Sequence, residues 1–562
     1  MASSIDPVTF SIVSQALMAT CKEMTVNLLR AAYSTVIREA SDASAALIDV
    51  AGDIVAQADD MPIHLNSMSE AFKGLMRKHD LSTMEPGEIL VTNDPFAGGQ
   101  HLNDVFVFSP IHHEGRLVAF AGSVGHHVDI GGGGAGSMNP TARDVFAEGF
   151  VIPRIRIKVG SNIRDGLFGE LFSANIRVPH ETIGDLNAQL AANRTGAIRL
   201  QHLFRKYGAE TVLGCMTELV CFAEARTREE IAKLPPGEYR GEDVLDDDGM
   251  GNGPFRVRVT VRAQGDRLVV DFTGTDPQAK GYVNAPLAST KAAVATAIKD
   301  LLTGSRVPAN EGCYRPVEIV VPEGTLLNPR PPAPVRARVN ACIRAFHAVV
   351  NAMAPVLPER AIGTCQDSSV LVFSEQVGRG YRVFTEPVRG GFGAGLGNDG
   401  AIQCATPLDN CTNTPIEAGE LTFGFMRIRR YELVPDSQGF GQYSGAMGAV
   451  REYEIVRDGV EYAGFSDRHK HPATGLFGGG GGRPTEFVLL RDGERRVLPS
   501  KGSLSLRKGD RLQAWIGGTG GYGAPRQREH ALVLRDLREG RISPATARTV
   551  FQVDPAEAGV GR

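Results

Sequence analysis

Two short segments, HLND (101–104) and GHHVD (125–129), carry the side chains best suited to chemistry. They flank two apolar runs, VFVFSPI (105–111) and RLVAFAGSV (116–124), and the turn HHEG joins these runs. Alternating apolar residues on both sides of a short glycine-containing turn predict a β-hairpin. The imidazoles and carboxylates would then stand together where the two strands of this hairpin end.

The turn decides which residues of the two strands face each other, because opposed residues in a hairpin are counted from its loop. A two-residue loop at 113–114 would place His101 opposite His126. A loop one residue later would place Asp104 opposite Gly125. Both registers bring the two polar segments side by side, with opposed Cβ atoms about 5 Å apart.

A mixed set of imidazole and carboxylate groups is suited to Zn, Mn or Fe(II) rather than to Ca or Mg. We therefore expect His101, Asp104 and His126 or His127 to bind a divalent metal, with Zn or Mn as the first choice. Three or four protein ligands would leave a position open for water, and a bound divalent ion lowers the pKa of water toward neutrality. The alternative is that surface histidines gather beside a turn without binding an ion.

Other candidates lie close to the predicted hairpin in sequence. His64, in MPIHLNSM, could face the same site or be a buried histidine with satisfied hydrogen bonds. Asp42 lies between a predicted helix and a predicted strand, where a fourth ligand or an ordinary turn residue would fit equally. The glycine-rich DIGGGGAGSMNP (129–140) could hold an anion on its backbone N–H groups or form a flexible loop.

The hairpin lies in a chain whose pattern predicts both helices and strands. Residues 6–40 predict one long amphipathic helix, begun by Asp6 and Pro7, and AALIDVAGDIVAQ (45–57) predicts two short strands about a turn. Further helices are predicted at 185–208, 209–234, 289–304 and 340–357. From 240 onward β-rich segments predominate, and from 421 strands alternate with glycine turns.

These elements predict an α+β protein, with a mixed helical and β N-terminal region that carries the metal-binding hairpin and a β-rich C-terminal region. We expect a catalytic region at 1–240, a mixed middle domain at 241–420 and a β-rich domain at 421–562. Glycines also cluster at 478–482 and 517–523, which predicts sharp turns or close approaches of the backbone.

The composition narrows the possible partners. The chain has 562 residues, with 60 Lys and Arg against 64 Asp and Glu, and a net charge of −4. It therefore lacks the excess of positive charge that attracts nucleic acid or anionic lipid. No apolar run reaches the roughly 20 residues of a membrane span, and the N-terminus lacks the pattern of a signal peptide. Eight cysteines without a C-x-x-C pair fit a reducing compartment. We expect a cytoplasmic protein with no nucleic-acid or membrane partner.

A series of ordered motifs resembles the hydantoinase B family from about residue 6 to 555. They are MPIHLNSM, TNDPFAGGQHLNDV, GHHVDIGG, GSM, EGFVIP, GDLNAQ, VDFTGTDPQ, GYVN, EGCYRPVEIVVPEGTLLNP, NTPIE, RYEL and GGTGGYGAP. This family includes β subunits of ATP-dependent N-methylhydantoinases and lactamases, the second half of 5-oxoprolinases and subunits of acetone and acetophenone carboxylases. HLND and FVIPRI depart slightly from the commoner wording of the family.

The resemblance implies the β subunit of an ATP-dependent cyclic amide hydrolase. A hydantoinase A-type partner would use ATP to phosphorylate the carbonyl of a hydantoin, lactam or 5-oxoproline, and this chain would open the ring with water at a metal. The family's metal ligands fall on Asp42, His101, Asp104 and His126, of which the last three would be catalytic, while His127 and Asp129 would support them. An αβ heterotetramer or a larger assembly is expected.

The chain contains no G-x-x-x-x-G-K-[ST] motif, which fits an enzyme whose ATP binds to a partner subunit. Two alternatives remain. One is a subunit of an ATP-dependent ketone carboxylase of the acetone or acetophenone type. The other is a noncatalytic scaffold for the ATP-binding partner, although a scaffold has no use for converging histidines and aspartates.

Overall fold

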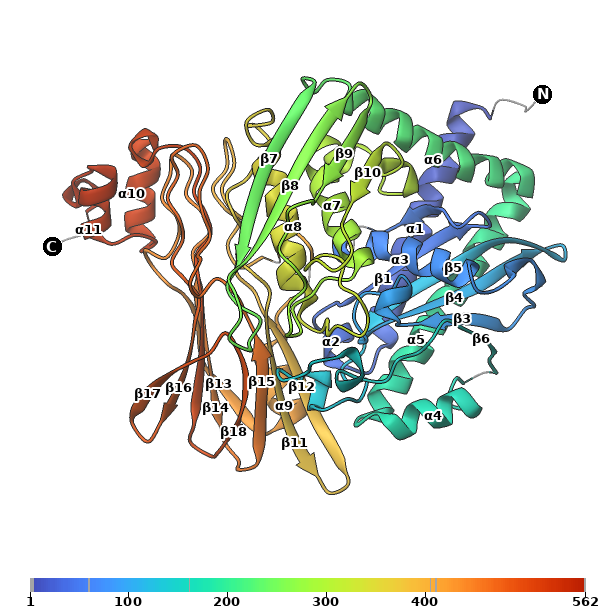
Figure 1. The fold of residues 1–562 in the computed structure, drawn as a ribbon, viewed down its shortest axis with the longest axis horizontal. Coiled ribbons are helices and arrows are strands. Elements are labelled where there is room, and N and C mark those ends of the chain that lie inside the picture. Colours follow the sequence, from blue (N-terminus) through green and yellow to red (C-terminus); the bar gives the residue numbers. More distant parts are fainter. Residues whose placement is uncertain (1–4, 59–60, 161, 405, 410–411, 560–562) are drawn as a thin grey trace. The chain divides into compact units, whose positions relative to one another are not determined.

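A computed structural model describes residues 5–58, 61–160, 162–404, 406–409 and 412–559 (Figure 1). The described chain divides into two compact units. Unit 1 comprises Met1–Tyr239 and Val259–Arg338, and unit 2 comprises Arg240–Arg258 and Val339–Arg562. The α+β class expected from the sequence is confirmed. The predicted middle region, 241–420, is shared between the two units: residues 259–338 belong to unit 1, and residues 241–258 and 339–420 belong to unit 2.

Unit 1 is built around one six-stranded sheet in the order β2-β1-β5-β4-β3-β6. Its strands are β1 (Ala43–Asp49), β2 (Ile54–Gln57), β3 (Glu88–Thr92), β4 (Asp104–His113), β5 (Arg116–His126) and β6 (Ile155–Lys158). The helices of this part are α1 (Pro7–Ala31), α2 (Thr35–Arg38), α3 (Pro62–Met76), α4 (Leu167–Asn175), α5 (Pro179–Tyr207) and α6 (Ala209–Ile231). Helices α1 and α5 contact each other and the central strands, and α3 contacts the same strands (Figure 1).

The two faces of this sheet are covered by different helices, and strand alternation assigns each residue to one of them. Phe106 and Phe108 of β4 pack in the same cluster as Phe72 of α3. Val105 and Val107 pack in the cluster that contains Leu186 and Leu190 of α5. Even-numbered residues of β4 therefore face α3, whereas odd-numbered residues face α5.

The predicted hairpin is formed by β4 and β5. Next to the turn its register is the second of the two expected ones, and beyond a bulge it differs from that register by one residue. The loop is Glu114–Gly115, as in the second alternative, and His113 pairs with Arg116. A β-bulge between Ile111 and His112 then shifts the pairing, so that Asp104 lies opposite His126. A bulge adds one residue to one strand only, and counting from the turn cannot detect it.

The long helix predicted for 6–40 is interrupted. Asp6 caps α1 through hydrogen bonds from Val8 N and Thr9 N to its Oδ1, but α1 ends at Ala31 and the short α2 follows. Between them, the carboxylate of Asp185 on α5 accepts hydrogen bonds from the backbone N–H groups of residues 33 and 34. Asp185, which is distant in sequence, thus interrupts the helix at residues 33 and 34. The apolar periodicity of residues 6–40 gives no sign of this interruption.

The remainder of unit 1 contains one further helix, which packs on α3, and three strands. Helix α7 (Leu287–Leu302) contacts α3, and Lys291 of α7 pairs with Glu70 of α3. Strands β8 (Phe255–Gln264), β9 (Arg267–Asp271) and β10 (Val317–Val320) follow, with β9 antiparallel to β8 and parallel to β10. The boundary between the units falls within β7 (Gly237–Leu245) and within β8.

Unit 2 is mainly β and contains two sheets, in the orders β12-β11-β15-β18 and β13-β14-β19-β16-β17. Their strands are β11 (Ser369–Val377), β12 (Gly380–Val388), β13 (Met426–Leu433), β14 (Ala449–Ile455), β15 (Val460–Phe465), β16 (Glu486–Arg491), β17 (Glu494–Leu498), β18 (Lys501–Leu506) and β19 (Arg511–Ile516). Helices α8 (Arg338–Met353), α9 (Ile416–Phe423), α10 (His530–Arg538) and α11 (Pro544–Thr546) complete the part of the chain after 337.

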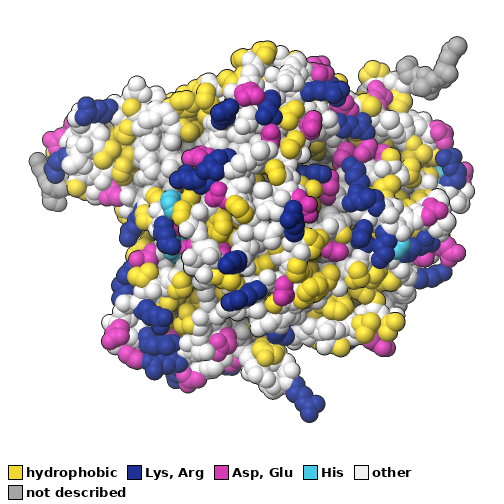
Figure 2. Space-filling model, viewed as in Figure 1, with side chains coloured by type: hydrophobic (Ala, Val, Ile, Leu, Met, Phe, Trp, Pro, Cys, Tyr) yellow, Lys and Arg dark blue, Asp and Glu magenta, His cyan; other side chains and the backbone are white. Residues whose placement is uncertain are grey.

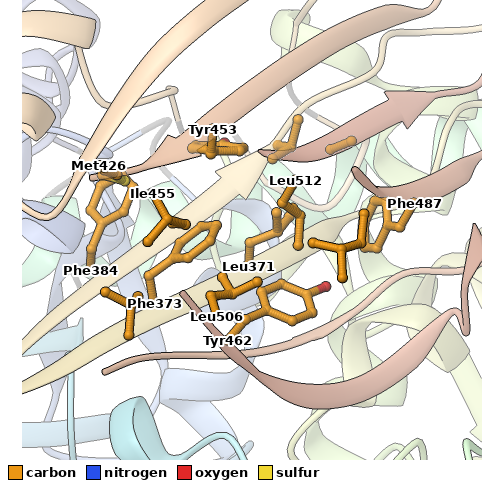
Figure 3. Close-up of a cluster of buried hydrophobic side chains, with 14 of the residues drawn as sticks. Leu371, Phe373, Phe384, Met426, Tyr453, Ile455, Tyr462, Phe487, Leu506 and Leu512 are labelled. Atoms are coloured by element: carbon orange, nitrogen blue, oxygen red, sulfur yellow. The ribbon is translucent and has the colours of Figure 1, made fainter. Parts of the chain in front are cut away.

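Side chains from both sheets form one buried core, as Figure 3 shows for the aromatic and aliphatic residues at its centre. Phe373 of β11 contacts Tyr453 of β14, with ring centroids 5.0 Å apart, and Tyr462 of β15 at 5.7 Å. Two antiparallel sheets whose inner faces share a core form a sandwich.

The C-terminal glycine clusters are sites of close backbone packing in unit 2. A Cβ atom on Gly439 would lie 2.2 Å from the carbonyl oxygen of Gly480, and one on Gly482 would lie 2.1 Å from that of Gly518. Backbone hydrogen bonds accompany these approaches, such as Gly521 N to Gly480 O at 3.0 Å. At these clusters the loops therefore pack closely against one another. Of the two predictions from the sequence, sharp turns or close approaches of the backbone, these positions show the second.

The surface carries both signs of charge. On the face shown in Figure 2, Lys and Arg side chains are interspersed with Asp and Glu side chains, in keeping with the net charge of −4. Among the described residues, none of the helices combines the length and the apolar character needed to cross a membrane.

Candidate metal centre

Three candidate ligands lie in a row across the neighbouring strands β1, β5 and β4. Asp42 directly precedes β1, and its carbonyl oxygen accepts a hydrogen bond from His126 N at 3.0 Å. His126 ends β5 and lies opposite Asp104, the first residue of β4. The left-handed backbone of Ser41 (φ 63°) turns the chain from α2 into β1 and so leaves Asp42 at the strand mouth.

His101 reaches the same place through the turn that precedes β4. Gly98 adopts φ 108° directly after Pro95–Ala97, and a Cβ atom there would lie 2.3 Å from the carbonyl oxygen of Glu70 in α3. The turn closes with a hydrogen bond from Asp104 N to His101 O at 3.1 Å. Nδ1 of His101 is 3.0 Å from Oδ2 of Asp104, and the His101 and His126 rings lie 4.8 Å apart.

The ligand atoms of His101, Asp104 and His126 all lie within 4.8 Å of one another, and all three residues are buried. His64, in the first turn of α3, joins them from the helix that covers the even-numbered face of the sheet. Its Nε2 is 3.5 Å from Oδ1 of Asp42 and 3.6 Å from Oδ1 of Asp104.

His126 lies between the same two carboxylates as His64. Nδ1 of His126 is 3.4 Å from Oδ1 of Asp104 and 3.6 Å from Oδ2 of Asp42. Two carboxylates and two imidazoles thus alternate around a small closed ring of oxygen and nitrogen atoms. Sequence reasoning placed His64 second to the other four, and its position beside both carboxylates makes it a fifth candidate ligand.

The chemistry of this donor set fits a divalent ion. Oδ1 of Asp42 and Oδ1 of Asp104 are buried and make no hydrogen bond within the described part of the chain. Buried polar atoms are nearly always hydrogen-bonded, so such a group requires an explanation. Ligand atoms about 2.1 Å from a tetrahedral zinc ion lie about 3.4 Å from one another. The nitrogens of His64 and His126 lie 3.4–3.6 Å from the oxygens of Asp42 and Asp104.

For His101 and Asp104, the electrostatics of the cluster favour the protonation states that metal ligands need, whereas the carboxylates of Asp104 and Asp42 raise the pKa of His64 despite its burial. Burial, with the Arg338 guanidinium nearby, holds the pKa of His101 well below its usual value, which keeps the imidazole neutral. Burial would raise the pKa of Asp104, but the guanidinium of Arg338 and the imidazole of His64 hold that pKa well below its usual value. A neutral imidazole and an ionised carboxylate are the ligand forms that bind a metal.

Arg338 belongs to the site, and sequence reasoning missed it. Its Nη2 donates a hydrogen bond of 2.5 Å to Oδ2 of Asp104, and its Nη2 and Nε both donate to Oε1 of Gln100. The side chain of Arg338 is only 6% exposed. The sequence offers no local signal for this contact, because 234 residues separate Arg338 from Asp104.

Glu148 holds the segment that leads to Arg338. Its buried carboxylate accepts hydrogen bonds from the backbone N–H groups of Val335 at 2.8 Å and Arg336 at 2.8 Å. Burial raises the pKa of Glu148 to about 8, although these hydrogen bonds favour its ionised form. Arg336 in turn donates from Nε to the carbonyl oxygen of Ser137 at 3.2 Å.

His127 and Asp129, expected to support the ligands, lie among other partners. Nε2 of His127 is 3.0 Å from Oε1 of Gln189 on α5, on the odd-numbered face of the sheet. Asp129 accepts hydrogen bonds from the backbone N–H groups of Gly131 and Gly136, both at 2.9 Å. The glycine loop therefore does hold an anion, but that anion is a carboxylate of the chain itself.

Comparisons with known proteins place the chain in a family. It belongs to the hydantoinase B/oxoprolinase family, whose model matches residues 6–525. It is 33% identical to the B subunit of a putative D-/L-hydantoinase from Pseudomonas sp. (strain NS671), over 98% of this chain and 95% of that protein.

Two solved structures share its fold. The crystal structure of the ATP-dependent caprolactamase from Pseudomonas jessenii matches with a TM-score of 0.90 and 29% identity, covering 98% of this chain and 97% of that one. A nucleotide-free acetone carboxylase matches with a TM-score of 0.88, covering 97% of this chain and 79% of the other. At 18% identity, the second likeness concerns the fold alone.

Proposed function

We propose that this chain is the B-type subunit of an ATP-dependent cyclic amide hydrolase and that it opens the ring of a hydantoin, lactam or 5-oxoproline-type substrate with water. The observation that carries the proposal is the buried set of His101, Asp104 and His126, whose ligand atoms all lie within 4.8 Å of one another. Membership of the hydantoinase B/oxoprolinase family and the similarity to a caprolactamase favour cyclic amides as substrates.

Asp42, His101, Asp104 and His126 are the proposed metal ligands, and His64 is an additional candidate. A divalent ion, Zn or Mn, would supply Lewis acidity and lower the pKa of water toward about 7. These residues would hold the ion away from bulk solvent, since His64, His101 and Asp104 are at most 1% exposed. Low exposure strengthens the electrostatic interactions within the site.

The proposed enzyme works with a second subunit that carries the ATP site. The relative from Pseudomonas sp. is named as one subunit of a hydantoinase, and the structural relative is named as ATP-dependent. This chain contains no G-x-x-x-x-G-K-[ST] motif. We propose a hydantoinase A-type partner that phosphorylates the carbonyl oxygen of the ring, in an αβ heterotetramer or a larger assembly.

The test combines metal analysis with activity. The purified chain is assayed for bound metal, and the complex with its partner is assayed for ATP-linked turnover of hydantoins, lactams, 5-oxoproline and ketones. We expect about one divalent ion per site and ring opening of a cyclic amide. The double variant His101→Ala, Asp104→Ala should lose both the ion and turnover, because it removes an imidazole and a carboxylate from the set.

His79→Ala is the matched control. His79 lies in the same unit, and its Nε2 lies 3.0 Å from the carbonyl oxygen of Arg154 rather than beside the proposed ligands. This variant should retain metal and activity. The proposal fails if the His101 and Asp104 double variant keeps both. Carboxylation of a ketone without ring opening of any cyclic amide would instead favour a carboxylase subunit.

A further inference from the structure

Arg338 uses only part of its hydrogen-bonding capacity on the protein. Its Nη2 and Nε donate to Asp104 and Gln100. Among the residues that the structure describes, none accepts a hydrogen bond from Nη1. A guanidinium has five N–H donors in a fixed fork, so Arg338 retains donors next to the proposed metal ligands.

The net charge of the metal-loaded site favours the binding of an anion to the remaining donors of Arg338. The two carboxylates, Asp42 and Asp104, balance a divalent ion, and the imidazoles of the ligand set add no charge when they bind it. Arg338 then adds a positive charge that these two carboxylates do not balance. A cation this close to a metal ion is repelled by it, and this cost is offset when an anion binds to both.

Arg338 is also held rigidly. Gln100, which accepts from Arg338, donates from Nε2 to the carbonyl oxygen of Ile63 beside His64. Glu148 fixes the backbone of Val335 and Arg336, immediately before Arg338. Groups that are fixed before the substrate arrives need no reorganisation at the moment of reaction, which increases their electrostatic effect.

We propose that Arg338 is a substrate-binding residue of this site, holding Asp104 through Nη2 and donating through Nη1 to an anionic oxygen of the activated substrate, such as a phosphoryl oxygen. This inference rests on the proposed function, and it adds a residue that recognises the negative charge of the activated ring. A neutral cyclic amide would not use the unbalanced charge, whereas a phosphorylated one would.

The competing role for Arg338 is purely structural, as a counter-ion that orients Asp104. The two roles differ in what the loss of the guanidinium changes. A structural counter-ion affects the binding of metal, because Asp104 is a proposed ligand. A substrate-binding group affects the binding of an anion to the site after metal is already bound.

The experiment measures the binding of inorganic phosphate to the full chain loaded with Mn²⁺, by calorimetry, for the wild type and for Arg338→Gln. Metal content is measured in the same samples. We expect Arg338→Gln to keep its metal and to bind phosphate about tenfold or more weakly, since a charge-assisted hydrogen bond is lost. Arg199→Gln, which removes a surface guanidinium paired with Glu23 in the same unit, should bind phosphate like the wild type.

Arg338→Lys keeps the charge but lacks the fork that serves two partners at once, so its phosphate affinity should lie between those of the wild type and Arg338→Gln. Three outcomes would overturn the inference: no phosphate binding by the loaded wild type, unchanged affinity in Arg338→Gln, or loss of metal in that variant. If Arg338→Gln does not fold, unchanged affinity in Arg338→Lys overturns it. A wild-type chain that binds no metal would instead refute the proposed function.

Discussion

The adjacent histidines of the second hairpin strand have different surroundings because neighbouring residues of a strand point to opposite faces of the sheet. His126 faces α3 together with Asp104 and lies 3.4 Å from its Oδ1. His127 faces α5 and contacts Gln189. The sequence left the choice between them open, and the residue opposite Asp104 in the register decides it.

This difference predicts different effects of two single substitutions. His126→Ala should lower metal affinity by more than the roughly 10–100-fold that loss of an outer hydrogen bond costs, because a ligand is removed. His127→Ala should lower it by less than about tenfold. Competition with a chromophoric chelator measures both affinities, and equal losses in the two variants would contradict the assignment.

At the scale of elements, the site depends on pieces that are brought together from distant parts of the chain. The β4–β5 hairpin carries Asp104 and His126, α3 carries His64, and α8, which follows the segment held by Glu148, begins with Arg338. Hairpin pairing is local, and the sequence predicted it. The position of α3 and of the segment before α8 depends on packing between residues far apart in sequence.

Glu148 gives this arrangement a dependence on pH. Its pKa rises from 4.5 to about 8 in the folded chain, so the folded state binds the proton more tightly than the unfolded state between these values. Stability should therefore fall as pH rises through this window, by at most about 1.4 kcal/mol per pH unit. Glu148→Gln, which has no proton to lose, should show a flatter dependence.

Urea unfolding from pH 5 to 8, followed by the transition of unit 1, measures this slope. Glu210→Gln is the control, since the side chain of Glu210 is 89% exposed and its loss should leave the slope unchanged. Parallel curves for the wild type and Glu148→Gln would show that Glu148 does not titrate in this range.

At the scale of the whole molecule, all the candidate ligands belong to unit 1, while unit 2 has a separate sandwich core. A ligand that binds only the folded state stabilises it by about 2.7 kcal/mol when its concentration is 100 times its Kd. Removal of metal with EDTA should therefore speed amide hydrogen exchange in β1, β4, β5 and α3.

Exchange in β11, β14 and β19 should change less, because these strands contribute no ligand. Mass spectrometry of proteolytic fragments separates the two sets within one experiment. Equal acceleration in both sets would mean that the two units unfold together. No acceleration in β4 and β5 would argue against a metal between their ends.

The sequence by itself determined the α+β class, the hairpin and the meeting of HLND with GHHVD, because these depend on local periodicity and on a turn a few residues long. The tertiary structure alone decided the bulge that pairs Asp104 with His126, the position of His64 beside both carboxylates and the arrival of Arg338. Each of these results from contacts between segments far apart in the chain, for which no local pattern of residues provides a signal.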